Sequence, residues 1–118
     1  MAQAARKLGI LISVAPTHPN FHHGLQLATA ALEAQDEVYL YCLDDAVQGV
    51  DDPRTQILRT HGLRLFACAF AAQRRKLPQN ENALYGGLTM LNDVMAATDR
   101  FVSFNWWMKF QRNKPLLN

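Results

Sequence analysis

Cysteine is scarce in this chain, which has only two among its 118 residues, and the two show no regular spacing. A small secreted domain held together by disulfides needs more cysteines, and a chain of this length can bury a core without them. The composition therefore favours a reducing compartment. We expect a cytoplasmic protein with no disulfide framework.

Charge of one sign and long apolar runs are lacking too. The net charge is only +2, and the positive residues are scattered except at Arg74 to Lys76 and near the chain ends. We therefore expect no nucleic-acid surface. No apolar run approaches the length that spans a bilayer, so we expect no membrane association. Arg6 and Lys7 before residues 8–15 resemble a secretory signal, but this run is short and rich in Ile and Val, which favours a first strand.

The sequence has no nucleophile elbow, no phosphate-binding glycine loop and no dinucleotide fingerprint, and Gly86 with Gly87 is only a weak phosphate signal. We therefore expect no cofactor. Four aspartates lack the spacing of a calcium loop, and helix caps and loop ends explain them more simply: Asp44, Asp45, Asp51 and Asp52. We expect no metal site.

Histidines are few, but His18 and His22 are four residues apart, as two ligands on one helix face would be. Pro19 pushes the residue before it out of helical geometry, so these two side chains are not expected to share a face. His18 stays a candidate at the edge of a site, where it would orient a substrate or influence a thiolate. The other interpretation is a structural or solvent-exposed histidine.

Apolar runs typical of strands alternate with helical segments. We expect strands at 8–14, 37–43, 63–67 and 101–104, and a polar loop at 77–85. Helices are expected at about 20–35, after an Asp52 cap, after Cys68, and from about 86 to 98, with Gly62 ending the second. This alternation predicts an α/β three-layer sandwich with a mainly parallel central sheet of four to five strands, as in flavodoxin-like proteins.

Residues 1–104 would form a single domain, and residues 105–118 a C-terminal tail that mixes aromatic and basic side chains. The tail contains Trp106, Trp107, Met108 and Phe110 with Lys109, Arg112 and Lys114. It is interpreted either as an interface or lid, or as a cover for the edge of the chain's own sheet.

Cys68 follows the apolar run 63–67 and precedes an alanine-rich segment that favours helix. The thiol would therefore lie at a helix N-terminus, where unpaired N–H groups and the helix dipole stabilise a thiolate. The backbone amides of Ala69 and Phe70 would form the anion-stabilising cradle, and Arg74 and Arg75 would add positive potential. From spacing alone, a small buried core cysteine explains Cys68 equally well.

Cys42 lies inside an apolar strand and is interpreted as a core residue rather than a resolving thiol. If the strands follow the order 2-1-3-4, the second and third lie two spacings apart, roughly 9 to 10 Å. A disulfide needs Cα atoms within about 7 Å, so we expect no bond between Cys42 and Cys68.

The run from Cys68 to Leu77 resembles the cysteine motif of the DsrE/TusD (DsrE/DsrF-like) family of sulfur-relay proteins. In that motif a cysteine is followed by small residues, Gln or Leu, two arginines, glycine and an aliphatic residue. Gly87-Leu88 and the run Asp99 to Phe104 resemble a helix start and the closing strand of the family. The chain departs from the motif at Phe70, where a small residue is usual, and at Lys76, where glycine is common.

This resemblance implies a DsrE-like fold over about residues 7–104 and a small cytoplasmic protein that forms a homo- or hetero-oligomer. Its cysteine, here Cys68, would accept sulfane sulfur as a persulfide from a donor protein and pass it to an acceptor protein. We therefore predict an intracellular sulfur-relay protein, a persulfide carrier or sulfurtransferase. The alternative is a non-catalytic oligomeric subunit or small-ligand binding module of the same fold, in which Phe70 closes off the thiol.

Overall fold

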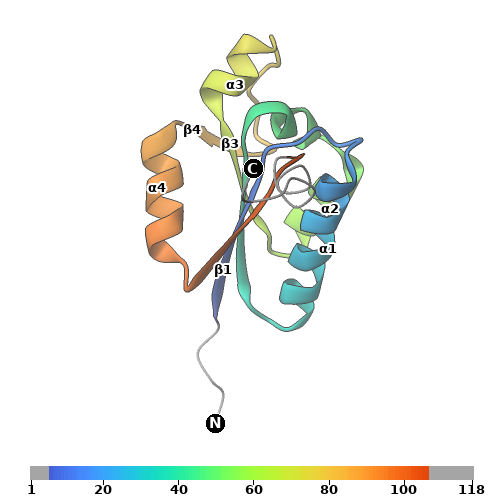
Figure 1. Ribbon diagram of the computed structural model, residues 1–118, viewed down its shortest axis with the longest axis vertical. Helices are drawn as coiled ribbons and strands as arrows, with labels where there is room; N and C mark the ends of the chain where they lie inside the picture. Colours follow the sequence, from blue (N-terminus) through green and yellow to red (C-terminus); the bar gives the residue numbers. More distant parts are fainter. Residues whose placement is uncertain (1–5, 107–118) are drawn as a thin grey trace, which may run out of the picture.

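The computed structural model describes residues 6–106 and shows a five-stranded sheet between helices (Figure 1). The strands are β1 (Lys7–Ile12), β2 (Glu37–Cys42), β3 (Arg64–Cys68), β4 (Leu84–Gly86) and β5 (Arg100–Phe104). The helices are α1 (Pro19–Glu33), α2 (Pro53–Thr60), α3 (Ala69–Arg74) and α4 (Leu88–Ala97), with a 3₁₀ helix η1 (Asp44–Gly49) after β2.

All neighbouring strands of the sheet are parallel, and their order is β4-β3-β2-β1-β5. Helices α1 and α2 cover one face, α4 covers the other, and α3 lies beyond the carboxyl end of the sheet (Figure 1). The predicted three-layer α/β sandwich is therefore confirmed. In such a sheet the segments that follow the strands meet at one edge, where Cys68 and the residues after β2 lie.

The strand order that we considered, 2-1-3-4, is wrong for this sheet. The second strand lies between the first and third, because the crossovers from β1 through β4 all continue in one direction. Alternation of strands and helices predicts parallel pairing, but the direction of each crossover depends on tertiary packing. As a consequence β2 and β3 are adjacent, and the segments that follow them, η1 and α3, pack against each other.

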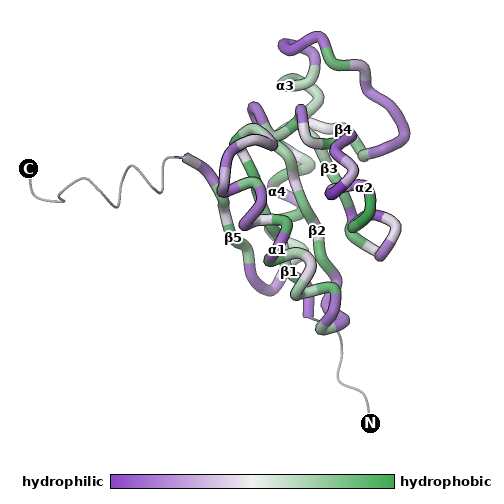
Figure 2. Tube along the Cα trace, turned by 90° about the vertical axis from the view of Figure 1, so that its right-hand side faces the viewer, coloured by the Kyte–Doolittle hydropathy of each residue, from purple (hydrophilic) through white to green (hydrophobic). Residues whose placement is uncertain are grey.

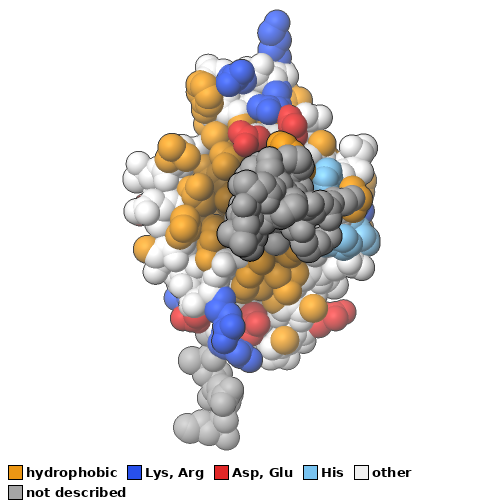
Figure 3. Space-filling view, in the orientation of Figure 1, with side chains coloured by type: hydrophobic (Ala, Val, Ile, Leu, Met, Phe, Trp, Pro, Cys, Tyr) orange, Lys and Arg blue, Asp and Glu red, His pale blue; other side chains and the backbone are white. Residues whose placement is uncertain are grey.

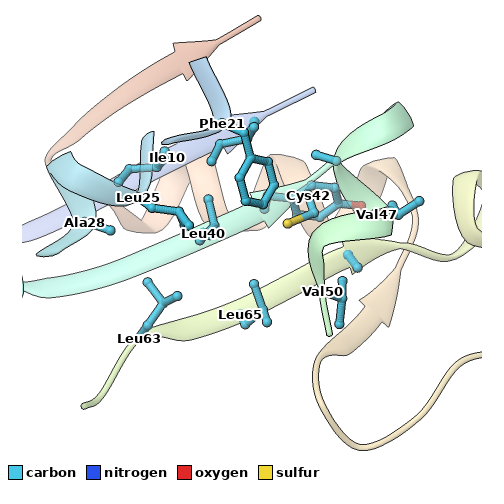
Figure 4. Close-up of a cluster of buried hydrophobic side chains, with 14 of the residues drawn as sticks. Ile10, Phe21, Leu25, Ala28, Leu40, Cys42, Val47, Val50, Leu63 and Leu65 are labelled. Atoms are coloured by element: carbon cyan, nitrogen blue, oxygen red, sulfur yellow. The ribbon is translucent and has the colours of Figure 1, made fainter. Parts of the chain in front are cut away.

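The core lies mainly between α1 and the central strands. Phe21, Leu25 and Ala28 of α1 pack toward Ile10 and Leu40 of the sheet (Figure 4). Residues 38–42 of β2 are all buried, as expected for a central parallel strand covered on both faces. Figure 2 shows the hydrophobic segments along the central strands and the hydrophilic ones mainly in the connections.

Three helices end in a residue with left-handed backbone geometry. Gly62 follows α2 with φ of 106°, and this predicted helix end is confirmed. Gln35 follows α1 with φ of 67°, and Lys76 follows α3 with φ of 56°. After α3, Lys76 N–H donates to the Gln73 carbonyl and the next amide to the Ala72 carbonyl, which is a Schellman motif. A glycine fits this position best, which gives a physical reason for the glycine that is common there in the family motif.

Strand β4 was not predicted. It has three residues at the edge of the sheet, within a segment that we expected to be a polar loop leading into a helix. Leu84 also fits the helical spacing of the apolar residues that follow it, so the pattern favoured the wrong element. Among the described residues, no helix is both long and apolar enough to cross a membrane.

Candidate functional site

Cys68 is the last residue of β3 and the N-cap of α3. Its Sγ accepts a hydrogen bond from the backbone N–H of Ala71 at 3.4 Å. The N–H groups of a first helical turn usually bond to an oxygen of Ser, Thr, Asp or Asn, so sulfur takes the place of that oxygen here. The predicted position of the thiol at a strand-to-helix junction is confirmed.

The amide that bonds to the sulfur belongs to the third helical residue, Ala71, whereas the sequence pointed to Ala69 and Phe70. N-cap side chains generally accept from the second or third helical N–H, so capping geometry would have identified this residue. The amides of Ala69 and Phe70 lie in the same first turn, whose N–H groups have no carbonyl of a preceding helical turn to bond. Their part in holding an anion stays a prediction.

A pocket of about 500 Å³ lies beside Cys68. Its walls come from Leu43 and Asp44 after β2, from α3, and from Gly87 and Leu88 at the start of α4. The Cys68 residue itself is 5% exposed. Cys68 is therefore shielded from bulk solvent, although it lines a space that a small group can enter.

The two arginines of the cysteine motif have different surroundings. The Arg75 guanidinium donates to the Asp45 carboxylate from Nε at 3.0 Å and Nη2 at 2.8 Å, and from Nη1 to the Ala71 carbonyl at 3.1 Å. Arg75 thereby joins the end of α3 to η1. The exposed Arg74 guanidinium lies over the Phe70 ring, 5.7 Å from its centroid. Both arginines line the pocket, but Arg75 is neutralised by a carboxylate and Arg74 faces solvent.

Phe70 lines the pocket and is 64% exposed. A ring with this exposure lies mainly in solvent, so it narrows the mouth of the pocket without sealing the sulfur. The low exposure of Cys68 comes instead from its place at the end of a buried strand, where Ala67 and Ala71 are buried beside it.

Tyr41 supports one wall of the pocket, and the sequence did not indicate this. Its side chain is fully buried, and its hydroxyl donates to the carbonyls of Gly87 at 2.9 Å and Gly86 at 3.3 Å. Burial raises the pKa of Tyr41 to about 12, which keeps the hydroxyl protonated and able to donate. Tyr41 thus holds the junction of β4 and α4, where Gly87 and Leu88 line the pocket. A tyrosine in an otherwise apolar buried strand must find such a partner, and that was the available signal.

Cys42 is fully buried in β2, and burial raises the pKa of its thiol to about 12. Its register partner in β3 is Ala67, the residue before Cys68. Because side chains alternate between the faces of a sheet, Cys42 and Cys68 point to opposite faces. Both cysteines are free. The expected absence of a disulfide between them agrees with this geometry, although the strand spacing from which we argued was wrong.

His18 lies beyond β1 and caps α1. Its Nδ1 accepts a hydrogen bond from the backbone N–H of Asn20 at 3.0 Å. It is outside the helix that contains the exposed His22, as Pro19 predicted. Strand β2 separates β1 from β3, so His18 is at the same edge of the sheet as Cys68 but does not line its pocket.

Three of the four aspartates noted in the sequence have structural partners: Asp45, Asp51 and Asp52. Asp52 caps α2 and binds Arg54 at 2.9 Å, and this hydrogen-bonded arginine lowers the pKa of Asp52. Asp51 accepts from Asn82 at 2.6 Å, which attaches the loop before β4 to the turn after η1. Within residues 6–106, no group of three or more potential ligand side chains is placed to hold a metal ion. Tail residues 107–118 lie outside the described part of the chain, so the interpretation of the tail stays a prediction.

Comparison with known proteins identifies the fold and the family. The chain is similar to the crystal structure of the ychN protein from E. coli, with 20% identity, coverage of 84% of this chain and 99% of that chain, and a TM-score of 0.73. At this identity the likeness shows the fold alone. No curated protein matches the sequence. The profile of the DsrE/DsrF-like family matches residues 6–104, from β1 to β5, so the resemblance seen in the cysteine motif is confirmed and the chain belongs to this family.

Proposed function

We propose that this chain carries sulfane sulfur as a persulfide on Cys68 within a sulfur relay. The observation that carries the proposal is a thiol at a helix N-terminus, with a backbone N–H directed at its sulfur and a pocket beside it. Anions are stabilised at such a position, and the thiolate is the nucleophilic form of cysteine. Membership of the DsrE/DsrF-like family supports a relay function.

The proposed step is thiol exchange. The Cys68 thiolate attacks the terminal sulfur of a donor persulfide, a new S–S bond forms at Cys68, and the donor leaves as a thiolate. The proton of the donor persulfide stays on the transferred sulfur. An acceptor thiolate then attacks that sulfur, takes it as its own persulfide, and returns Cys68 to the thiolate form. Each transfer is balanced without an added oxidant, reductant or metal.

The arginines would have separate roles in this step. Arg74 is exposed and would steer an anionic partner surface toward the pocket, an effect that weakens with salt. Arg75 is held by Asp45 and would keep α3, and hence the capping amides, in place over the sulfur. The amides of Ala69 and Phe70 would add to the bond from Ala71 when the sulfur is ionised.

The partners would be a donor protein that presents a persulfide and an acceptor protein with a reactive thiol. Because exchange requires free thiols, a reducing compartment such as the cytoplasm suits this chemistry, and both cysteines of the chain are free. We further propose that the chain works as a homo- or hetero-oligomer, so that one particle presents several thiols.

A non-catalytic subunit or small-ligand binding module is the alternative, and one observation favours it. Cys68 is only 5% exposed, so a protein partner must insert a segment into the pocket to reach the sulfur. Phe70 does not explain this burial, since its ring is mostly exposed. The two functions differ in whether the Cys68 thiol reacts at neutral pH.

Loading with polysulfide followed by peptide mapping by mass spectrometry tests the proposal. The peptide that contains Cys68 should gain the mass of one sulfur atom and lose it on reduction. Cys68→Ser should abolish the gain, and Cys42→Ala should keep it. Alanine is the better control at Cys42, because a serine hydroxyl would be buried there without an assured partner. Loading on Cys42, or on neither residue, would contradict the proposal.

A further inference from the structure

Charged residues at the Cys68 pocket leave one charge of each sign without a partner. The pocket is lined by Asp44, Arg74 and Arg75. Arg75 is paired with Asp45, which does not line the pocket. Within residues 6–106, the Asp44 carboxylate has no hydrogen bond or ion pair, and Arg74 has no carboxylate partner. The pocket therefore presents one uncompensated negative group and one uncompensated positive group.

The local structure keeps these two groups in defined places. Asp44 follows β2 with φ of 49°, a left-handed geometry that Asp and Asn adopt more readily than most residues. Arg74 ends α3, and its guanidinium lies over the Phe70 ring, 5.7 Å from the centroid. Figure 3 shows acidic and basic side chains beside each other near α3, at the top of the molecule. Asp44 and Arg74 nevertheless form no ion pair with each other, so both charges can bind a ligand.

The rest of the pocket lining is mostly apolar. It includes Leu43, Phe70, Ala71 and Leu88. Apolar walls with a few polar groups are typical of small-molecule sites, and a volume of about 500 Å³ is in their usual range. Phe70, which replaces a small residue of the family motif, forms part of the wall and also supports Arg74. A short ligand with an apolar or sulfur-containing body and one charge of each sign fits this lining.

We propose that the pocket binds the persulfide of a free, cysteine-type amino acid as the sulfur donor for Cys68. The α-ammonium group would bind Asp44, and the α-carboxylate would bind Arg74, because charge-assisted hydrogen bonds of this kind are strong and directional. This inference rests on the proposed carrier function and names a donor class for it. Cys68 is 5% exposed, so a small donor can reach a sulfur that a protein donor reaches only by inserting a segment.

The transfer from such a donor is balanced. The Cys68 thiolate attacks the terminal sulfur of the amino-acid persulfide, and an S–S bond forms at Cys68. The S–S bond of the donor breaks, its electron pair leaves with the inner sulfur, and the free amino acid departs as a thiolate. The proton stays on the transferred sulfur. The spent donor keeps both charges of its headgroup, so free cysteine should compete with the donor for the pocket.

Protection of Cys68 from iodoacetamide at low salt, followed by peptide mapping, tests binding without any sulfur transfer. S-methylcysteine is the probe, because it keeps the zwitterionic headgroup and has no reactive sulfur. It should slow alkylation several-fold at a concentration at which methylthiopropionate and methylthioethylamine, which each keep one charge, have little effect. S-methylglutathione should also have little effect, since its zwitterionic end is far from its sulfur. Added salt should weaken the protection, because it screens both charges.

Variants assign the two ends of the probe. Asp44→Asn should remove the advantage of S-methylcysteine over methylthiopropionate, which lacks the ammonium group. Arg74→Gln should remove its advantage over methylthioethylamine, which lacks the carboxylate. Asparagine also adopts left-handed geometry, so the first variant keeps its backbone. Asp36→Asn and Arg100→Gln are matched controls and should protect Cys68 like the wild type, because these residues line a different pocket at the amino end of the sheet.

Sulfur loading then separates this inference from the carrier function. The wild type should load Cys68 from both cysteine persulfide and polysulfide. Asp44→Asn should load several times more slowly than the wild type from cysteine persulfide, but not from polysulfide, which has no ammonium group. Loading from polysulfide alone would overturn this inference and leave the carrier function intact, whereas loading from neither donor would overturn both.

The protection assay has its own contradicting results. Equal protection by S-methylcysteine and its two single-charge analogues would mean that the pocket does not recognise a zwitterion. Full protection of Asp44→Asn by S-methylcysteine would mean that Asp44 does not hold the ammonium group. Stronger protection by S-methylglutathione would mean that the ligand is a peptide thiol instead of a free amino acid. Each of these results would overturn the inference.

Discussion

Tyr41 and Thr55 offer a pair of hydroxyl deletions that should change stability in opposite directions. The Tyr41 hydroxyl is buried and donates to two carbonyls, those of Gly86 and Gly87. The Thr55 Oγ1 is buried in α2, and no hydrogen-bond partner for it lies within residues 6–106. Tyr41→Phe removes a satisfied hydroxyl, and Thr55→Val replaces an unsatisfied hydroxyl by a methyl group of the same shape.

The magnitudes follow from these contacts. A net hydrogen bond is worth about 0.5 to 1.5 kcal/mol, and one hydroxyl is lost in Tyr41→Phe, so we expect a loss of about 1 kcal/mol in the free energy of unfolding. Gly87 is exposed, so water can replace the lost donor in part, which keeps the cost near this value. Thr55→Val removes the cost of burying an unpaired hydroxyl and adds a buried methyl, so we expect a gain of about 1 kcal/mol.

Urea unfolding at one fixed protein concentration measures both changes, and the slope with denaturant should stay constant in each variant. Tyr41→Phe should also speed alkylation of Cys68, because the β4–α4 junction loses its anchor, whereas Thr55→Val should leave that rate unchanged. A destabilised Thr55→Val would mean that the threonine hydroxyl has a partner, and an unchanged Tyr41→Phe would mean that the two glycine carbonyls do not hold the hydroxyl. Either result would refute the reasoning from these contacts.

Three further changes test other contacts. Lys76→Gly should stabilise the fold by up to about 1 kcal/mol in urea unfolding, since φ of 56° suits glycine; a loss of stability would contradict this. Cys42 keeps its proton up to about pH 12 in the folded chain but loses it near pH 9 when the chain is unfolded. The free energy of unfolding should therefore fall between pH 9 and 12, by at most about 1.4 kcal/mol per pH unit. Cys42→Ala should remove this part of the fall. Arg74→Ala should slow sulfur exchange with an anionic donor at low salt but should not slow alkylation of Cys68 by iodoacetamide. Arg75→Ala, which leaves Asp45 without its arginine, should change both rates. Equal effects of the two variants would contradict their separate roles.

Most of the fold could be predicted because its signals are local. The runs that became β1, β2, β3 and β5 are apolar and are separated by capped helices, so their existence and parallel pairing followed from the sequence. Strand β4 could not be predicted in the same way, because three edge residues carry no periodicity of their own. Strand order also failed, since nothing local to a strand specifies which neighbour its crossover reaches.

The site, like the fold, could be predicted only where its signals are local in sequence. The position of Cys68 at a helix N-terminus followed from an apolar strand and an alanine-rich segment that are adjacent in sequence. The anchor of Tyr41 and the bond from Arg75 to Asp45 join residues 30 or more positions apart. Both depend on β2 lying beside β3, which the sequence pattern did not specify.

The most direct test of sulfur transfer at Cys68 follows one isotopically heavy sulfur atom into and out of the protein by intact-mass spectrometry. The wild type and Cys42→Ala should gain one heavy sulfur from a labelled persulfide donor and release it to an added acceptor thiol, which should then carry the label as its own persulfide. Cys68→Ser should do neither. Label that enters Cys68→Ser, or that enters the wild type and is never passed to an acceptor, would contradict a carrier function for this cysteine.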